Sequence, residues 1–101
     1  MSEFPLPNVS TDLSGQVAFV TGTTSGLGKR FAKVLAACGA KVALTGRRVE
    51  RLEALADEIR ADGGVCEPIP LDMTSRESIR AALSEAEEKL GTIQILINNA
   101  G

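Results

Sequence analysis

The fold expected for this chain is decided by residues 16–28, which read Gln-Val-Ala-Phe-Val-Thr-Gly-Thr-Thr-Ser-Gly-Leu-Gly. The four apolar residues 17–20 lack the polar alternation of a half-exposed strand, so they predict a strand buried on both faces. Gly22, Gly26 and Gly28 follow, and the apolar spacing beyond them predicts a helix. Gly22 suits a tight turn, because glycine adopts backbone angles that a side chain resists.

The other two glycines predict close approaches. We expect Gly26 to let the main chain come near a bound group and Gly28 to let the new helix pack against the strand. A helix N-terminus carries unpaired N–H groups and a partial positive charge, which favour a phosphate there. The segment therefore predicts a site for the pyrophosphate of a dinucleotide, with a plain strand-to-helix loop as the alternative.

The spacing excludes two related glycine loops. In a phosphate-binding P-loop the second glycine would fall at Leu27, and Lys29 would be followed by Ser or Thr rather than Arg30. The G-x-G-x-x-G fingerprint fails because Thr24 stands where its second glycine belongs. What remains is Thr-Gly-x-x-x-Gly-x-Gly, beginning at Thr21.

Composition narrows the possible functions. The 101 residues are 44% hydrophobic and 24% charged with net charge -2, which predicts one globular domain and no nucleic-acid partner. Without a signal-peptide pattern or an apolar run of about 20 residues, we expect a cytoplasmic protein with no membrane partner. The sequence contains no His and no Tyr. A His-based triad, a His-ligated metal site and a Tyr general acid are therefore excluded within it.

Strands and helices are expected to alternate along the chain. The order predicts an α/β fold, a Rossmann-type doubly wound parallel sheet with strand order 3-2-1-4. Residues 1–12 are expected to be a flexible leader and residues 13–101 a partial dinucleotide-binding domain. The predicted strands are 17–20, 41–45, 65–71 and 93–97, and helices are expected after the glycine loop, before residues 62–64 and over 74–90.

Several packing details are also predicted. Cys38 and Cys66 are expected to be buried free thiols, and Pro68 places the third strand at an edge of the sheet. Thr74 and Glu77 form a capping-box pattern for the third helix. The apolar stripe expected to face the core from the first helix is Leu27, Phe31, Val34, Leu35 and Cys38.

The second strand is followed by residues that indicate the cofactor. A site for NAD places a carboxylate about 20 residues past the glycine loop, to bind the ribose hydroxyls. Here that place holds Gly46, followed by Arg47. A guanidinium can bind the 2′-phosphate of NADP with two hydrogen bonds, so NADP is predicted over NAD. The alternative is that Arg47 and Arg48 begin a solvated helix.

The ends of the third and fourth strands add further candidates. Asp72 can accept a hydrogen bond from the adenine amino group, with Met73 covering the ring; the alternative is a turn-forming Asp. One amide of residues 98–99 can bond across strands to fix the loop. Ala100 and Gly101 leave room for a ribose.

Three segments, residues 21–28, 71–74 and 98–101, together resemble the short-chain dehydrogenase/reductase family in order and separation. Within it the chain looks most like bacterial NADP-dependent reductases of the 3-oxoacyl-carrier-protein type. Ser25 departs from many NADP-preferring members, which carry a basic residue there. The resemblance implies phosphate and ribose contacts at Gly22, Thr24, Ser25 and Leu27, 2′-phosphate selection at Arg47, adenine binding at Asp72 and ribose contact near Asn99.

The same resemblance implies the chemistry. Family catalysis uses a Ser and a Tyr-x-x-x-Lys motif beyond the fourth strand, and this chain has no Tyr. We therefore expect an N-terminal fragment of an NADP-dependent oxidoreductase acting on a small alcohol or ketone, homo-oligomeric at full length. It would hold the cofactor and contain no catalytic residue and no metal. The alternatives are a non-catalytic nucleotide-binding module and, less favoured with only three aromatic residues, a flavodoxin-like domain.

Overall fold

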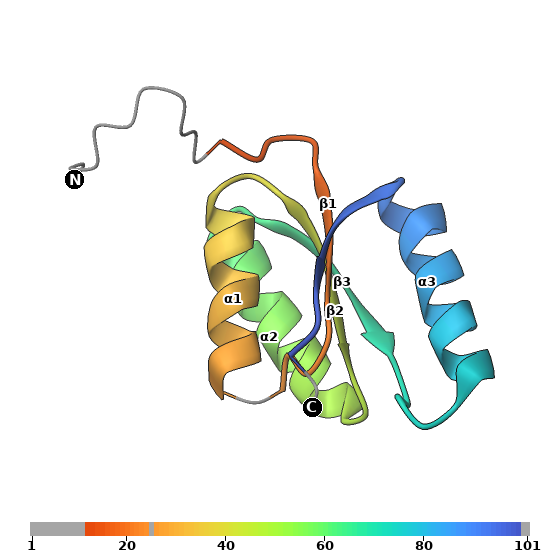
Figure 1. The fold of residues 1–101 in the computed structure, drawn as a ribbon. Helices are drawn as coiled ribbons and strands as arrows, with labels where there is room; N and C mark the ends of the chain where they lie inside the picture. Colours follow the sequence, from red (N-terminus) through yellow and green to blue (C-terminus); the bar gives the residue numbers. More distant parts are fainter. Residues whose placement is uncertain (1–11, 25, 100–101) are drawn as a thin grey trace.

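Four parallel strands form one sheet in the order β3-β2-β1-β4, as predicted. The computed structural model describes residues 12–24 and 26–99, so the expected leader lies outside the described residues except for Asp12. Helices α1 and α2 cover one face of the sheet and α3 covers the other (Figure 1). The elements are β1 (Val17–Val20), α1 (Gly26–Ala37), β2 (Lys41–Gly46), α2 (Val49–Ala61), β3 (Val65–Pro70), α3 (Arg76–Leu90) and β4 (Ile93–Ile97).

The central strand β1 supplies both core layers. Ala18 and Val20 lie in the layer beneath α1 and α2, whereas Val17 and Phe19 lie in the layer beneath α3. Successive side chains of a strand point to opposite faces, so an apolar run without alternation fits a strand that is covered twice. All four residues are buried, which confirms the prediction.

The edge position predicted for β3 is correct. β3 pairs with β2 alone among the described strands, and it contains Pro68 and Pro70. Proline cannot donate a hydrogen bond to the ladder, so it is tolerated at an edge.

Helix α1 corrects one prediction. It buries its small residues, and Leu27, Phe31 and Val34 are 57%, 39% and 54% exposed. Leu35 and Cys38 are half-buried, so the expected stripe does not form the core face. Small side chains let the helix backbone approach the sheet closely, and this approach selects the buried face. The residues of α1 that are buried are Gly28, Ala32 and Ala36.

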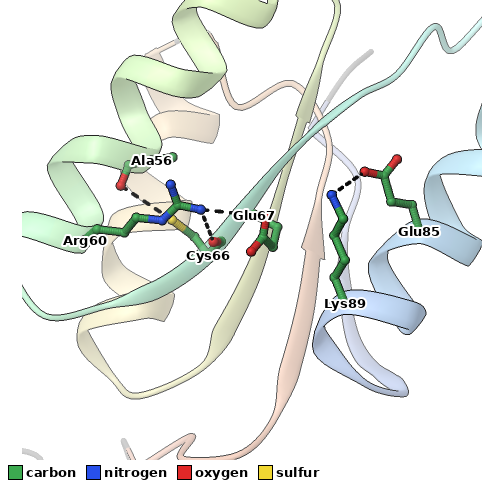
Figure 2. Close-up of polar contacts among 6 residues, drawn as sticks. All are labelled: Ala56, Arg60, Cys66, Glu67, Glu85 and Lys89. Carbon is green, nitrogen blue, oxygen red and sulfur yellow. Dashed lines mark hydrogen bonds and ion pairs between the residues drawn. The ribbon is translucent and has the colours of Figure 1, made fainter.

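Packing between α2 and β3 confirms the prediction for Cys66 but not the one for Cys38. Figure 2 shows Arg60 of α2 donating from Nη2 to the carbonyl oxygen of Cys66 at 3.0 Å and pairing with Glu67 at 3.7 Å. The thiol of Cys66 donates to the carbonyl oxygen of Ala56 at 3.6 Å, and burial raises the pKa of this thiol. Both cysteines are free, but only Cys66 is buried.

The start of α3 corrects a second prediction. Its N-cap is Ser75, whose hydroxyl accepts a hydrogen bond from the backbone N–H of Ser78 at 3.2 Å. The hydroxyl of Thr74 instead donates to Asp72, so Thr74 and Glu77 do not form a capping box. At the other end of α3, Lys89 and Glu85 form an ion pair at 2.8 Å, four residues apart on the helix (Figure 2). Within the described ranges, every helix is too short or too polar to cross a membrane.

Candidate functional site

The loop between β1 and α1 lies where the strand order reverses. β1 pairs with β2 on one side and with β4 on the other. In open α/β sheets, ligands bind at this switch point, outside the carboxyl ends of the strands. Every strand is parallel, so the segments that follow β1, β2, β3 and β4 all emerge at this edge.

Two buried threonines fix the loop to β2. Thr23 donates to the carbonyl oxygen of Thr45 from its backbone N–H at 3.1 Å and from its hydroxyl at 3.0 Å. The hydroxyl of Thr45 donates to the carbonyl oxygen of Val20 at 2.7 Å. The sequence did not predict this role of Thr23 and Thr45. A signal existed only at Thr45, which lies within an apolar strand, where a buried hydroxyl must find a partner.

The loop is also fixed to β4. Thr21 donates from its N–H to the carbonyl oxygen of Ile97 at 2.9 Å, and its hydroxyl accepts from the N–H of Asn99 at 2.8 Å. The Asn99 side-chain amide donates to the carbonyl oxygen of Gly22 at 3.4 Å. An asparagine amide therefore bonds across strands, as the sequence predicted.

The three glycines of the loop differ in why, or whether, the protein requires glycine at their positions. Gly22 has φ +67°, the left-handed region in which glycine is favoured, so the predicted tight turn is present. A Cβ on Gly28 would overlap the carbonyl oxygen of Gly22 and lie 2.7 Å from Nδ2 of Asn99. A Cβ on Gly26 would meet no described atom within 4 Å. Packing thus requires glycine at 28, whereas at 26 the protein itself leaves open space.

A pocket of about 260 Å³ lies between the glycine loop and the carboxyl ends of β2 and β3. Residues separated by up to 52 positions meet in it, because parallel strands present their carboxyl ends at one edge. Gly46, Arg48, Leu71 and Thr74 also line the pocket, although the sequence did not predict them as cofactor-binding residues. Five predicted site residues line this pocket: Gly22, Thr24, Arg47, Asp72 and Met73.

The remaining predicted residues lie elsewhere. Gly26 and Leu27 are exposed at the start of α1, and Asn99 lies against the loop on the β4 side. Ser25, Ala100 and Gly101 lie outside the described residues.

The carboxylate of Asp72 is held in one orientation. Its Oδ1 accepts from the hydroxyl of Thr74 at 2.6 Å and from the Thr74 N–H at 2.9 Å. These bonds, with a smaller contribution from Arg47, lower the pKa of Asp72 below its usual value. Within the described chain Oδ2 accepts no hydrogen bond, so an ionised acceptor is available at the pocket.

A hollow of about 290 Å³ lies at the opposite edge of the sheet, between the C-terminal ends of α1 and α2. Helix C-termini carry partial negative charge, and Asp62 adds to it, while Lys33, which also lines the hollow, is paired with Glu58. This hollow therefore suits a phosphate poorly, and the pocket beside the glycine loop is the better site for a dinucleotide.

A parallel α/β sheet with a glycine loop at its switch point defines a dinucleotide-binding protein of the Rossmann type. The family model described as "short chain dehydrogenase" matches residues 16–101. The chain belongs to the short-chain dehydrogenase family, whose members are oxidoreductases that bind NAD or NADP.

Curated relatives agree with this assignment. An uncharacterized oxidoreductase of Caenorhabditis elegans is 50% identical over 90 residues, which are 87% of this chain and 29% of that protein. A fatty acyl-CoA reductase of Mycobacterium tuberculosis is 40% identical over 90 residues, covering 89% of this chain and 31% of the relative. The chain thus spans about a third of the length of the curated relatives it matches.

Solved structures show the same fold. A dehydrogenase/reductase from Sinorhizobium meliloti superposes with a TM-score of 0.88 at 44% identity, covering 91% of this chain and 37% of that one. A metagenomic short-chain oxidoreductase in complex with NADP has a TM-score of 0.83 at 41% identity, covering 91% of this chain and 41% of its own.

Proposed function

We propose that this chain is the NADP-binding part of an oxidoreductase that transfers hydride between NADP(H) and a small alcohol or ketone. The single observation that carries the proposal is the pocket in which Arg47 and Asp72 meet beside the glycine loop. One residue offers a cation and the other an oriented carboxylate. The bound cofactor would supply or accept the hydride.

In this proposal the pocket holds the adenosine end of the cofactor. Oδ2 of Asp72 accepts a hydrogen bond from the adenine amino group, while Thr74 keeps Oδ1 occupied and the carboxylate ionised. Met73 is 40% exposed at the pocket, which leaves its side chain available to cover the base.

The end of β2 supports NADP over NAD. Gly46 lines the pocket, and even a Cβ there would lie 3.2 Å from Cγ2 of Thr24. Position 46 thus carries no carboxylate, and the side chain of an Asp or Glu there would be crowded by Thr24. Arg47 is exposed at the same pocket, where its guanidinium can form two charge-assisted bonds to a 2′-phosphate.

The glycine loop would hold the pyrophosphate. The N-terminus of α1 offers unpaired N–H groups to it, with Thr24, Ser25 and Leu27 as the predicted contacts. Asn99, Ala100 and Gly101 would face the nicotinamide ribose. We further infer that proton transfer is performed by residues outside this chain, in a homo-oligomeric cytoplasmic enzyme.

Replacing Arg47 tests the choice of cofactor. Arg47→Asp should weaken NADP binding relative to NAD by on the order of 1–3 kcal/mol, about tenfold or more, because a charge-assisted bond becomes a charge repulsion. The measurement is calorimetric titration of both cofactors into the protein expressed from its complete reading frame.

The matched control is Arg80→Asp, which makes the same charge change on the exposed surface of α3, away from the pocket lining. This control should leave the ratio of the two dissociation constants nearly unchanged. An unchanged ratio in Arg47→Asp, or an equal change in both variants, would contradict the proposal.

A further inference from the structure

A second pocket lies beside the cofactor pocket, in the cleft between α1 and α2. Its volume is about 280 Å³, and side chains of both helices and of the glycine loop line it. We call it the cleft pocket, and its polar lining consists of Thr23, Thr24, Lys29, Arg51 and Glu58. Thr24 also lines the cofactor pocket, so the two pockets are neighbours that share one wall.

The charged residues of the cleft pocket leave one cation without a counterion. Glu58 pairs with Lys33 at 2.6 Å and with Lys29 at 3.7 Å. The bond from Lys33 is the main reason why the pKa of Glu58 lies below its usual value. The carboxylate is therefore ionised and already compensated by two lysines of α1. Arg51 forms no ion pair with any residue of the described chain, so its guanidinium is available to a ligand.

Thr24 lies between Arg51 and the end of β2. Its hydroxyl oxygen would be 3.7 Å from a Cβ placed on Gly46, the residue directly before Arg47. Arg47 lines the cofactor pocket on one side of Thr24, and Arg51 lines the cleft pocket on the other. An anion held at Thr24 would therefore have one guanidinium on each side of it.

The stability of α2 does not explain this group of cations. Arg47, Arg48 and Arg51 lie within five residues, and Glu50 is the only acidic residue in the first turn of α2. Cations at the start of a helix oppose its dipole, and like charges repel one another. A phosphate bound beside Thr24 would offset both effects.

Resting on the proposed function, we propose that Arg51 is a second specificity-determining residue of the cofactor site. Its guanidinium binds the 2′-phosphate of NADP from the cleft pocket, while Arg47 binds the same phosphate from the cofactor pocket. The hydroxyl of Thr24 can donate a hydrogen bond to this phosphate as well. NAD lacks the phosphate and gains nothing from Arg51.

Calorimetric titration of NADP and of NAD into the protein expressed from its complete reading frame tests this role. Arg51→Gln should weaken NADP binding about three- to tenfold, because a charge-assisted contact that stays partly exposed is lost. It should leave NAD binding and the midpoint of thermal unfolding nearly unchanged, since Arg51 is exposed. Arg51→Lys keeps the charge and should restore part of the NADP affinity.

The matched control is Arg80→Gln, which removes the same charge from the exposed surface of α3 and should change neither affinity. An unchanged preference for NADP in Arg51→Gln, an equal loss for both cofactors, or an equal effect of Arg80→Gln would overturn the role of Arg51.

The outcome for Arg51 can be separated from the outcome for the proposed function. NADP binding that depends on Arg47 but not on Arg51 would overturn only the role of Arg51. If neither cofactor bound to the wild type, the proposed function would be wrong, and the role of Arg51 with it.

Discussion

At the scale of single residues, Gly28 is the glycine of the candidate site with the least space for a side chain. A Cβ there would overlap the carbonyl oxygen of Gly22, which is backbone and moves only if the loop moves. We therefore expect Gly28→Ala to lower the free energy of unfolding by about 1–3 kcal/mol, the usual cost of overpacking. It should also weaken cofactor binding, because the loop that would hold the pyrophosphate shifts. Urea denaturation of the cofactor-free protein measures the first effect.

Gly26→Ala is the matched control, since a Cβ at Gly26 would meet no described atom within 4 Å. Without cofactor it should unfold at the same urea concentration as the wild type or slightly higher. If both variants lost the same stability, the close contact between Gly28 and Gly22 would not be the cause.

Asp72 gives a prediction for pH. The hydroxyl and N–H bonds from Thr74 lower its pKa below 3.8 in the folded protein. A lowered folded-state pKa means that the stabilisation is present above about pH 4 and is lost as pH falls through the folded pKa. Thr74→Ala removes the hydroxyl bond, so the pKa of Asp72 should rise toward its ordinary value, measured by NMR titration of the carboxyl carbon. An unchanged pKa would show that the Thr74 hydroxyl is not the main cause.

At the scale of elements, two neighbouring side chains at the start of α3 have different roles: Ser75 caps the helix, whereas Thr74 bonds to Asp72. Ser75 caps the helix through Ser78, so Ser75→Ala should lower the free energy of unfolding by about 1 kcal/mol. Ser84→Ala, an exposed position in the middle of α3, is the control and should be neutral or slightly stabilising. Equal effects of the two variants in urea denaturation would contradict the assignment of the cap.

The same scale shows what the sequence could predict. Continuous apolar runs in the strands and the alternation of strands with helices indicate a parallel sheet, so the strand order could be predicted from the sequence. The buried face of α1 could not be predicted, because hydrophobic spacing favours the large residues Leu27, Phe31 and Val34. The sheet instead accepts the small residues Gly28 and Ala32 at close range. Likewise, a capping pattern at Thr74 is indistinguishable in sequence from the turn that Thr74 makes with Asp72.

At the scale of the whole molecule, topology explains why the candidate site was partly predictable. Thr24, Arg47 and Asp72 follow three different strands, and a parallel sheet brings their ends to one edge. The hydrogen bonds of Thr23 and Thr45 depend on the distance between neighbouring loops, which spacing in sequence does not give. Strand order thus predicts which residues meet, and packing decides which of them hold the site in place.

The uncovered β4 edge predicts how the 101-residue chain behaves by itself. Among residues 12–24 and 26–99, β4 pairs only with β1, so its other edge offers backbone groups to another copy, and Leu96, 63% exposed, adds an apolar side chain. Leu96→Lys should therefore reduce concentration-dependent association in sedimentation velocity, because a charge on an edge strand opposes pairing, while the midpoint of thermal unfolding stays nearly constant. Thr92→Lys, exposed just before β4, is the matched control for added charge. If both lysines reduced association equally, net charge and not the β4 surface would control it; if neither did, the open edge would not be where copies meet.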